Sequence, residues 1–147
     1  MLPRRGPQRA DARRPMSKRL DRAEIVVVDD DPDVREAVAL AFAAEGASVR
    51  TAGDGHEAVR VCHERTPQLV VLDMMLPGRS GYLVLEKIMG NAESPSVIML
   101  TANEGKRHMA YALSLGVDEF FVKPAPLEDL ILSAARLIGA RRADAGA

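Results

Sequence analysis

Short apolar runs and longer amphipathic segments alternate along most of the chain. The apolar runs, some of them unbroken, are typical of strands that are buried on both faces of a sheet. The predicted strands span 25–28, 48–52, 69–73, 96–102 and 119–124. Between and after them, apolar residues recur at spacings of three and four, which predicts helices. The predicted helices span 34–45, 53–64, 82–90, 104–115 and 126–142.

This order of elements predicts a single α/β domain. Parallel strands need crossover connections, and a helix after each strand supplies them. The predicted fold is therefore a doubly wound parallel sheet of five strands with five helices. We place this domain at residues 23–140, which is long enough to bury a core, and expect residues 141–147 to form a short C-terminal tail.

Charge is distributed unevenly along the chain. The formal net charge is −1, but residues 1–22 carry a net charge of +6 and the remainder carries −7. The first 22 residues contain three prolines and no apolar period, so we expect a disordered basic tail. Such an arm could contact nucleic acid, but a solvated tail, or upstream sequence that is not normally translated, is the favoured interpretation. We do not expect nucleic-acid binding.

The apolar runs and the cysteine content indicate where in the cell the protein is expected. The longest apolar run is far too short to span a bilayer, and no signal-like apolar stretch stands near the start. Cys62 is the single cysteine, which excludes an internal disulfide, and we expect it to be buried on a helix. We therefore expect a cytoplasmic protein without membrane insertion.

Side chains that carry chemistry stand at the carboxyl ends of the predicted strands. Five such residues are Asp29, Asp30, Asp73, Thr101 and Lys123. Ligands of open α/β sheets bind beyond these strand ends, at the point where the strand order reverses. We therefore expect three carboxylates, one hydroxyl and one ammonium group to converge on one crevice.

Carboxylates at this density indicate a bound cation. Asp29, Asp30 and Asp31 are consecutive, and at about 5 Å with an effective dielectric near 20 each pair costs roughly 3 kcal/mol. One aspartate is enough for a turn. Mg²⁺ would offset the repulsion, because it favours one or two carboxylates together with waters and a phosphate oxygen. With Thr101 and Lys123 as donors, the set has the parts that phosphoryl transfer needs.

Five segments resemble the receiver domains of two-component response regulators. They are IVVVDDDPDVRE, DGHEAV, LVVLDMMLPGRSG, VIMLTA and VDEFFVKP, and the resemblance covers about residues 24–140. It implies a flavodoxin-like fold with strand order 2-1-3-4-5. It also implies a CheY-like phosphoacceptor switch, and not an enzyme, that assists its own phosphorylation and slow dephosphorylation. No output domain is apparent, so we expect a stand-alone receiver.

The resemblance implies a role for each acidic residue. Asp73 would accept a phosphoryl group from a phosphohistidine on a histidine kinase or histidine phosphotransfer protein. Mg²⁺ would be bound by Asp30, Asp73 and the backbone carbonyl of Met75, and Asp29 would act through a coordinated water.

The resemblance also implies how the signal is produced. Thr101 would hydrogen-bond the phosphoryl group, Lys123 would pair with it, and the Lys123–Pro124 peptide would be cis. Phe120 would swing inward when Thr101 moves. The face built from the last two helices and the last strand would then shift and present itself to a downstream protein. We expect a monomer or a weak dimer that depends on phosphorylation.

Three positions depart from the usual pattern or adjust it. Phe120 lacks the hydroxyl that many receivers have as tyrosine, which disfavours partners that need that hydroxyl. In the receiver family, the positions two residues after the phosphorylated aspartate and two after the threonine set the dephosphorylation rate, and the resemblance assigns them to Met75 and Asn103. Met75 cannot orient an attacking water by a hydrogen bond, whereas Asn103 can, so we expect a fairly long-lived phosphoryl group.

Two other classes compete with the phosphoacceptor. A phosphatase with an aspartyl-phosphate intermediate could use a similar sheet, but such enzymes usually need a second acid two residues after the nucleophile, where Met75 stands. A receiver that is never phosphorylated could act only as a protein-binding module. The complete set of acidic residues with Thr101 and Lys123 argues against that alternative.

Overall fold

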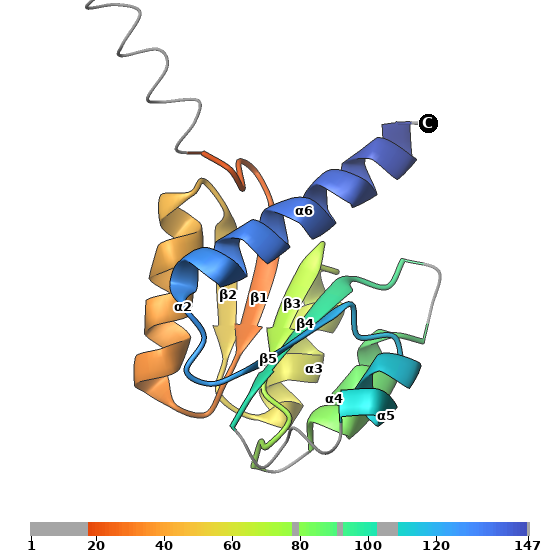
Figure 1. The fold of residues 1–147 in the computed structure, drawn as a ribbon. Helices are drawn as coiled ribbons and strands as arrows, with labels where there is room; N and C mark the ends of the chain where they lie inside the picture. The colour runs from red at the N-terminus through yellow and green to blue at the C-terminus, as the bar shows by residue number, and fades with distance from the viewer. Residues whose placement is uncertain (1–17, 78–79, 91–92, 103–108, 147) are drawn as a thin grey trace, which may run out of the picture.

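A five-stranded parallel sheet lies between two layers of helices in the computed structural model, which describes residues 18–77, 80–90, 93–102 and 109–146 (Figure 1). The strands are β1 (Glu24–Val28), β2 (Ser48–Ala52), β3 (Leu69–Leu72), β4 (Ser96–Thr101) and β5 (Glu119–Val122). They pair in the order β2-β1-β3-β4-β5, as the resemblance implied. The helices are α2 (Pro32–Ala44), α3 (Gly55–Glu64), α4 (Gly81–Ile88), α5 (Met109–Ser114) and α6 (Leu127–Gly146).

Each face of the sheet has its own hydrophobic core. Successive side chains of a strand point to opposite faces. Ile25 and Val27 of β1 accordingly join the core under α2 and α6, while Val26 and Val28 join the core under α3, α4 and α5. Cys62 is buried in the second core, as expected from its place on a helix. Burial on both faces explains why the central strands are continuously apolar.

The third aspartate after β1 caps a helix. The Asp31 side chain accepts a hydrogen bond from the backbone N–H of Asp33, and Pro32 occupies the first helical position of α2. Both features are preferred at helix N-termini. Asp31 therefore serves as the cap of α2, a role that Asp29 and Asp30 do not share.

The folded domain begins earlier than we predicted. Residues 18–22 were expected to belong to a disordered tail, but the Leu20 side chain is completely buried in the core under α2 and α6. Leu20 also donates its backbone N–H to the Glu45 carbonyl at the end of α2. The boundary at residue 23 was therefore wrong for this segment, and residues 1–17 lie outside the described part of the chain.

The last helix continues through the predicted tail. We expected α6 to end near residue 142, whereas it extends to Gly146. Arg141 donates to the Ser94 carbonyl, and Arg142 donates to the Asp21 carbonyl. These long-range contacts hold the final turns of α6 against the domain. In the described part of the chain, no helix is long and apolar enough to cross a membrane.

Candidate functional site

The register of the sheet brings Asp29 and Asp73 together. Val28 of β1 pairs with Leu72 of β3, so the two aspartates are the next residues of neighbouring parallel strands. The Asp73 backbone N–H donates to the Val28 carbonyl at 3.0 Å, which continues the sheet ladder one step beyond β3. Two carboxylates therefore leave the sheet side by side.

Asp30 completes a cluster of three carboxylates. One oxygen from each of Asp29, Asp30 and Asp73 can be chosen so that all three lie within 4.8 Å of one another. Asp29 and Asp73 are buried, with 2% and 4% of their surface exposed, whereas Asp30 is exposed. Two buried carboxylates beside one that faces solvent fit a hard divalent cation that keeps some of its waters, which is the preference of Mg²⁺.

Lys123 and Thr101 reach the same cluster from the other strand ends. The Lys123 ammonium Nζ lies 2.8 Å from Asp29 Oδ2 and 3.2 Å from Asp73 Oδ2. The Thr101 hydroxyl, completely buried, donates to Asp73 Oδ1 at 3.2 Å. The Lys123–Pro124 peptide is cis, as the resemblance implied. All five predicted side chains therefore converge, and they come from four strand ends.

Burial and charge shift the proton affinities of the site. Burial raises the pKa of Asp29, and the neighbouring Asp73 adds to this, although Lys123 and the Asp31 backbone N–H partly oppose it. Burial alone would lower the pKa of Lys123. The hydrogen bond to Asp29 and the charges of Asp73 and Asp29 outweigh it, so the pKa of Lys123 is raised. Lys123 is thus held as a cation between two carboxylates.

The loop after β3 is fixed by backbone hydrogen bonds. Met75 donates its N–H to Asp73 Oδ1 at 3.0 Å, and its side chain is exposed. Gly81 donates its N–H to the Met74 carbonyl at 2.9 Å. A β-carbon on Gly81 would lie 2.6 Å from Met74 Cα and 2.8 Å from the Asp73 carbonyl oxygen, closer than such atoms approach. The absence of a side chain at Gly81 therefore allows α4 to approach the loop that carries Asp73.

Gly81 is a residue that the sequence argument missed. The sequence placed Gly81 just before the predicted helix 82–90, and no hydrophobic period indicates its close approach to Met74. Ser80 caps α4, because its side chain accepts a hydrogen bond from the Leu83 N–H. A glycine directly after this cap residue is the one signal in the sequence that could have suggested the close approach. Contacts between a helix start and a neighbouring loop leave no periodic trace in the sequence.

The remaining predicted positions are placed only in part. Phe120 is half-buried on β5, where it pairs with Met99 of β4 and packs against the core under α3, α4 and α5. Asn103 lies outside the described residues, as does the first part of the predicted helix 104–115. The roles given to Phe120, Met75 and Asn103 stay predictions.

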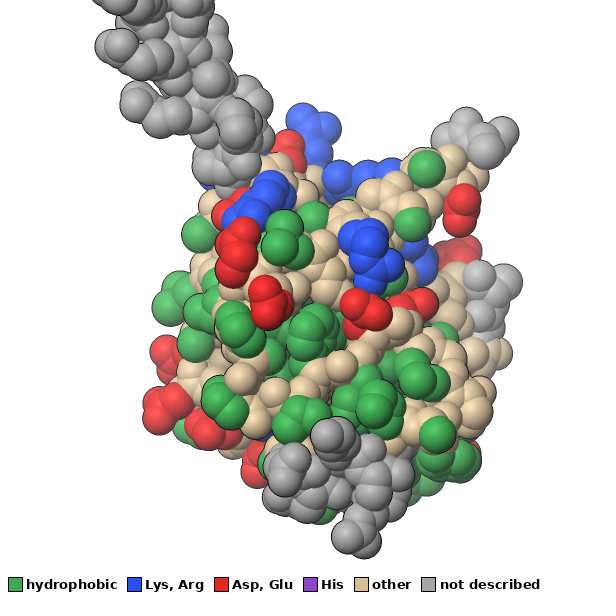
Figure 2. All heavy atoms as spheres, in the orientation of Figure 1, with side chains coloured by type: hydrophobic (Ala, Val, Ile, Leu, Met, Phe, Trp, Pro, Cys, Tyr) green, Lys and Arg blue, Asp and Glu red, His purple; other side chains and the backbone are tan. Residues whose placement is uncertain are grey.

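An apolar hollow flanks the site on the side of α2. It measures about 260 Å³ and lies between α2 and the connection from β5 to α6, with Lys123 among its lining residues. Figure 2 shows hydrophobic side chains gathered across this face of the molecule, over α2 and the β5–α6 connection. The reactive groups are therefore bordered by apolar surface on this side.

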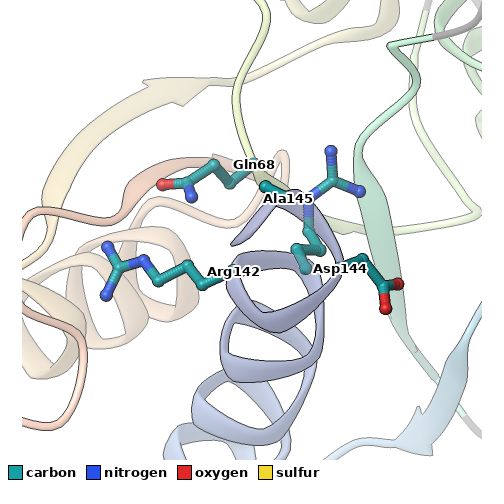
Figure 3. Close-up of a pocket in the computed structure, with 5 residues that line it drawn as sticks. Gln68, Arg142, Asp144 and Ala145 are labelled. Atoms are coloured by element: carbon teal, nitrogen blue, oxygen red, sulfur yellow. The ribbon is translucent and has the colours of Figure 1, made fainter. Parts of the chain in front are cut away.

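A second hollow, of about 350 Å³, lies at the opposite end of the sheet beside the end of α6. Gln68, Arg142 and Asp144 line it, and the Arg142 and Asp144 side chains point to opposite sides of α6 (Figure 3). The Arg142 guanidinium is already engaged with the Asp21 carbonyl. This hollow contains none of the clustered carboxylates, so it is not the candidate site.

The model of the response regulator receiver domain matches residues 25–135. This span contains every residue that converges on Asp73 and nearly all of the sheet. The chain therefore belongs to the response regulator receiver domain family. Receiver domains of two-component systems act as phosphoacceptor switches, interact with histidine kinases and downstream targets, and typically bind Mg²⁺ in an acidic pocket like the one described above.

Individual relatives agree with this assignment. TcrX of Mycobacterium tuberculosis, named a probable transcriptional regulatory protein, is 36% identical over 126 residues, which are 84% of this chain and 54% of that protein. The chain thus spans about half the length of this curated relative.

Solved structures show the same architecture. The receiver domain of NtrX from Brucella abortus is 33% identical, with a TM-score of 0.74, and the match covers 79% of this chain and 98% of that one. A CheY-like receiver domain protein from Methanospirillum hungatei is similar in fold, with a TM-score of 0.78 at 24% identity over 85% of this chain and 98% of that one.

Proposed function

We propose that Asp73 accepts a phosphoryl group from the phosphohistidine of a histidine kinase or histidine phosphotransfer protein. The observation that supports this is the convergence on one Asp73 carboxylate of Lys123 and Thr101, together with the Asp29 and Asp30 carboxylates. A nucleophilic carboxylate, a cation site and a positive side chain within contact distance are the components that phosphoryl transfer requires.

Each residue has a distinct part in this proposal. Asp30, Asp73 and the Met75 carbonyl would hold Mg²⁺, with Asp29 acting through a water, and the bound ion would offset the charge of the transferring oxygens. Lys123, now shared between Asp29 and Asp73, would turn its ammonium toward the new phosphoryl oxygens. Thr101 would exchange its hydrogen bond to Asp73 for one to the same group.

The signal would arise from these two exchanges. Phosphorylation replaces the single negative charge of the Asp73 carboxylate with a phosphoryl group of about −1.5 to −2 charges, and the oxygens of this group attract Lys123 and Thr101. Both residues lie at the ends of neighbouring strands, because Thr101 of β4 pairs with Val122, the residue before Lys123. A shift there would move β5 with α5 and α6, and Phe120 would follow it. This face would then bind the downstream protein.

The decisive experiment is phosphorylation of the purified protein by acetyl phosphate in Mg²⁺, followed by mass spectrometry of its peptides. We expect one phosphoryl adduct, located on Asp73 and absent when Mg²⁺ is removed by a chelator. Asp73→Asn should abolish the adduct. Asp144→Asn, which removes an exposed carboxylate at the opposite end of the sheet, should leave it unchanged. An adduct that survives Asp73→Asn would contradict the assignment.

Finer expectations belong to this proposal too. Met75 presents an exposed apolar side chain, which does not favour the phosphatase alternative and is in keeping with a long-lived phosphoryl group. The stand-alone role, the cytoplasmic location and the monomer or weak dimer stay predictions. TcrX extends well beyond the region that matches this chain, so the output of this chain is also part of the proposal.

A further inference from the structure

The carboxylate of Asp30 has no anchor of its own. Among the residues that the structure describes, none donates a hydrogen bond to it, and the side chain is exposed. Asp29 differs, because its carboxylate accepts from the Asp31 N–H at 2.9 Å and contacts Lys123 at 2.8 Å. The direction of the Asp30 side chain is therefore set by its backbone, and above all by the peptide that joins it to Asp29.

Arg35 holds that peptide. Its guanidinium Nη1 donates to the Asp29 carbonyl oxygen at 2.8 Å, from one turn inside α2. The Arg35 residue is half-buried although the next residue, Glu36, is exposed, so the side chain folds back toward the acidic loop. The preceding peptide is also held, because the Asp29 N–H donates to the Ala52 carbonyl at 3.1 Å. The backbone of Asp29 is thus tied to α2 on one side and to β2 on the other.

The space for the guanidinium is provided by Gly53. A β-carbon on Gly53 would lie 3.0 Å from Nη1 of Arg35 and 3.7 Å from its Cζ. Gly53 in turn donates its N–H to Glu57 Oε1 at 2.8 Å, which fixes the glycine against the first turn of α3. The backbone of Gly53 lies outside the left-handed region, so an alanine at this position would not strain the backbone. Its β-carbon would instead crowd the guanidinium of Arg35.

This geometry points to Arg35 as a positioning residue for the cation site: by holding the Asp29–Asp30 peptide it aims the otherwise unanchored Asp30 carboxylate at Asp73. The inference rests on the proposed function, because it assumes that the three carboxylates bind Mg²⁺. It extends that function to a residue that contacts neither the cation nor the phosphoryl group. Residues that orient the ligands of a metal typically change its affinity when they are removed.

A simple charge effect predicts the opposite result. Arg35 is a cation near three carboxylates, so its removal would make the site more negative and would tighten the binding of a divalent ion. Loss of positioning would weaken it. The sign of the change in Mg²⁺ affinity therefore separates the two roles.

The test is the dissociation constant for Mg²⁺, measured by isothermal titration calorimetry on the unphosphorylated full chain. We expect Arg35→Ala to raise the Kd by about 10-fold. Arg35→Lys, which keeps the charge and one donor, should restore part of the affinity. Gly53→Ala, which keeps Arg35 but crowds its guanidinium, should weaken binding less than Arg35→Ala. Arg65→Ala removes an exposed arginine that pairs with Glu24 and serves as the charge-matched control.

The outcomes separate this inference from the proposed function. A Kd for Arg35→Ala that is unchanged or lower than that of the wild type would overturn the positioning role while leaving the proposed function intact. Failure of the wild type to bind Mg²⁺ would contradict the proposed function itself, and the inference with it. Urea unfolding of each variant in a chelator is run alongside. A loss of Mg²⁺ affinity that merely follows a loss of stability, with no rescue by Arg35→Lys, would also overturn the inference.

Discussion

Lys123 illustrates how a single side chain stabilises an acidic site before any ligand arrives. Its Nζ lies within 3.2 Å of carboxylate oxygens from both Asp29 and Asp73, and both carboxylates are almost completely buried. Removing one partner of a buried ion pair leaves an uncompensated charge, which destabilises proteins strongly. The residue that is proposed to sense the phosphoryl group therefore also has a structural task in the unphosphorylated protein.

We predict that Lys123→Met lowers the free energy of unfolding by about 2 kcal/mol in a chelator, somewhat less than a fully buried pair because Lys123 is partly exposed. Mg²⁺ should stabilise this variant more than it stabilises the wild type, since the ion then supplies the positive charge that Lys123 no longer places between the carboxylates. Urea unfolding with and without Mg²⁺ measures both effects. Lys87→Met, at an exposed position on α4, should change stability by less than about 0.5 kcal/mol. Equal stability of the Lys123 variant and the wild type in the chelator would refute the structural task.

At the scale of elements, the site depends on how closely α4 approaches the end of β3. Gly81 begins α4 and lies against the backbone of Asp73 and Met74. Gly139 is also helical, but a β-carbon there would meet nothing within 4 Å. The two glycines are therefore a matched pair: one is required by a close approach and the other is not.

We predict opposite effects of alanine at these two positions. Gly81→Ala should destabilise the domain by about 2 kcal/mol, the usual effect of overpacking, and should slow phosphorylation by acetyl phosphate because the loop carrying Asp73 is displaced. Gly139→Ala should stabilise it by about 0.5 kcal/mol, since alanine is the better helix former, and should leave the phosphorylation rate unchanged. Denaturant unfolding and the rate of adduct formation are the measurements. Similar behaviour of the two variants would contradict the close approach.

The elements themselves were largely predictable, and the reasons are physical. Continuous apolar runs identified the central strands because parallel sheets are covered on both faces. The polar residues at the carboxyl ends of those runs identified the site, because the carboxyl ends of all strands in a parallel sheet lie at the same edge. Gly81 and Arg35 could not be predicted in this way. Their importance comes from contacts with neighbouring loops, at Met74 and at the Asp29 carbonyl, and such contacts follow no sequence period.

At the scale of the whole molecule, the segment before β1 ties the domain together. Arg19 contacts Glu45 at the end of α2 and Glu128 in the first turn of α6, which is 109 residues away in sequence. The hydrogen bonds from Arg19, and after them its positive charge, lower the pKa of both glutamates. The sequence reasoning assigned this segment to a tail because residues 1–22 contain three prolines and no apolar period.

We predict that Arg19→Ala lowers the unfolding midpoint in urea, and by more than Arg60→Ala, whose partners Glu57 and Glu64 lie on its own helix. The difference in stability between Arg19→Ala and the wild type should be largest above about pH 4.3, the pKa of glutamate in the unfolded chain. It should vanish as the pH falls through the lowered pKa values that Glu45 and Glu128 have in the folded protein. It should also shrink in high salt, because the groups are partly exposed. A difference that is independent of pH would show that Arg19 acts through packing alone.

The contact between Arg142 and the Asp21 carbonyl has a consequence for how the domain is approached. It places the beginning of the folded part and the last turns of α6 at the same pole, the one opposite the arrowheads of the strands in Figure 1. A partner protein that binds at Asp73 therefore approaches the carboxyl-terminal edge of the sheet, and residues 18 and 146 both lie away from this edge. A domain fused next to residue 18 or residue 146 would be attached at the end of the molecule opposite the acidic cluster. It would leave access to the three carboxylates open.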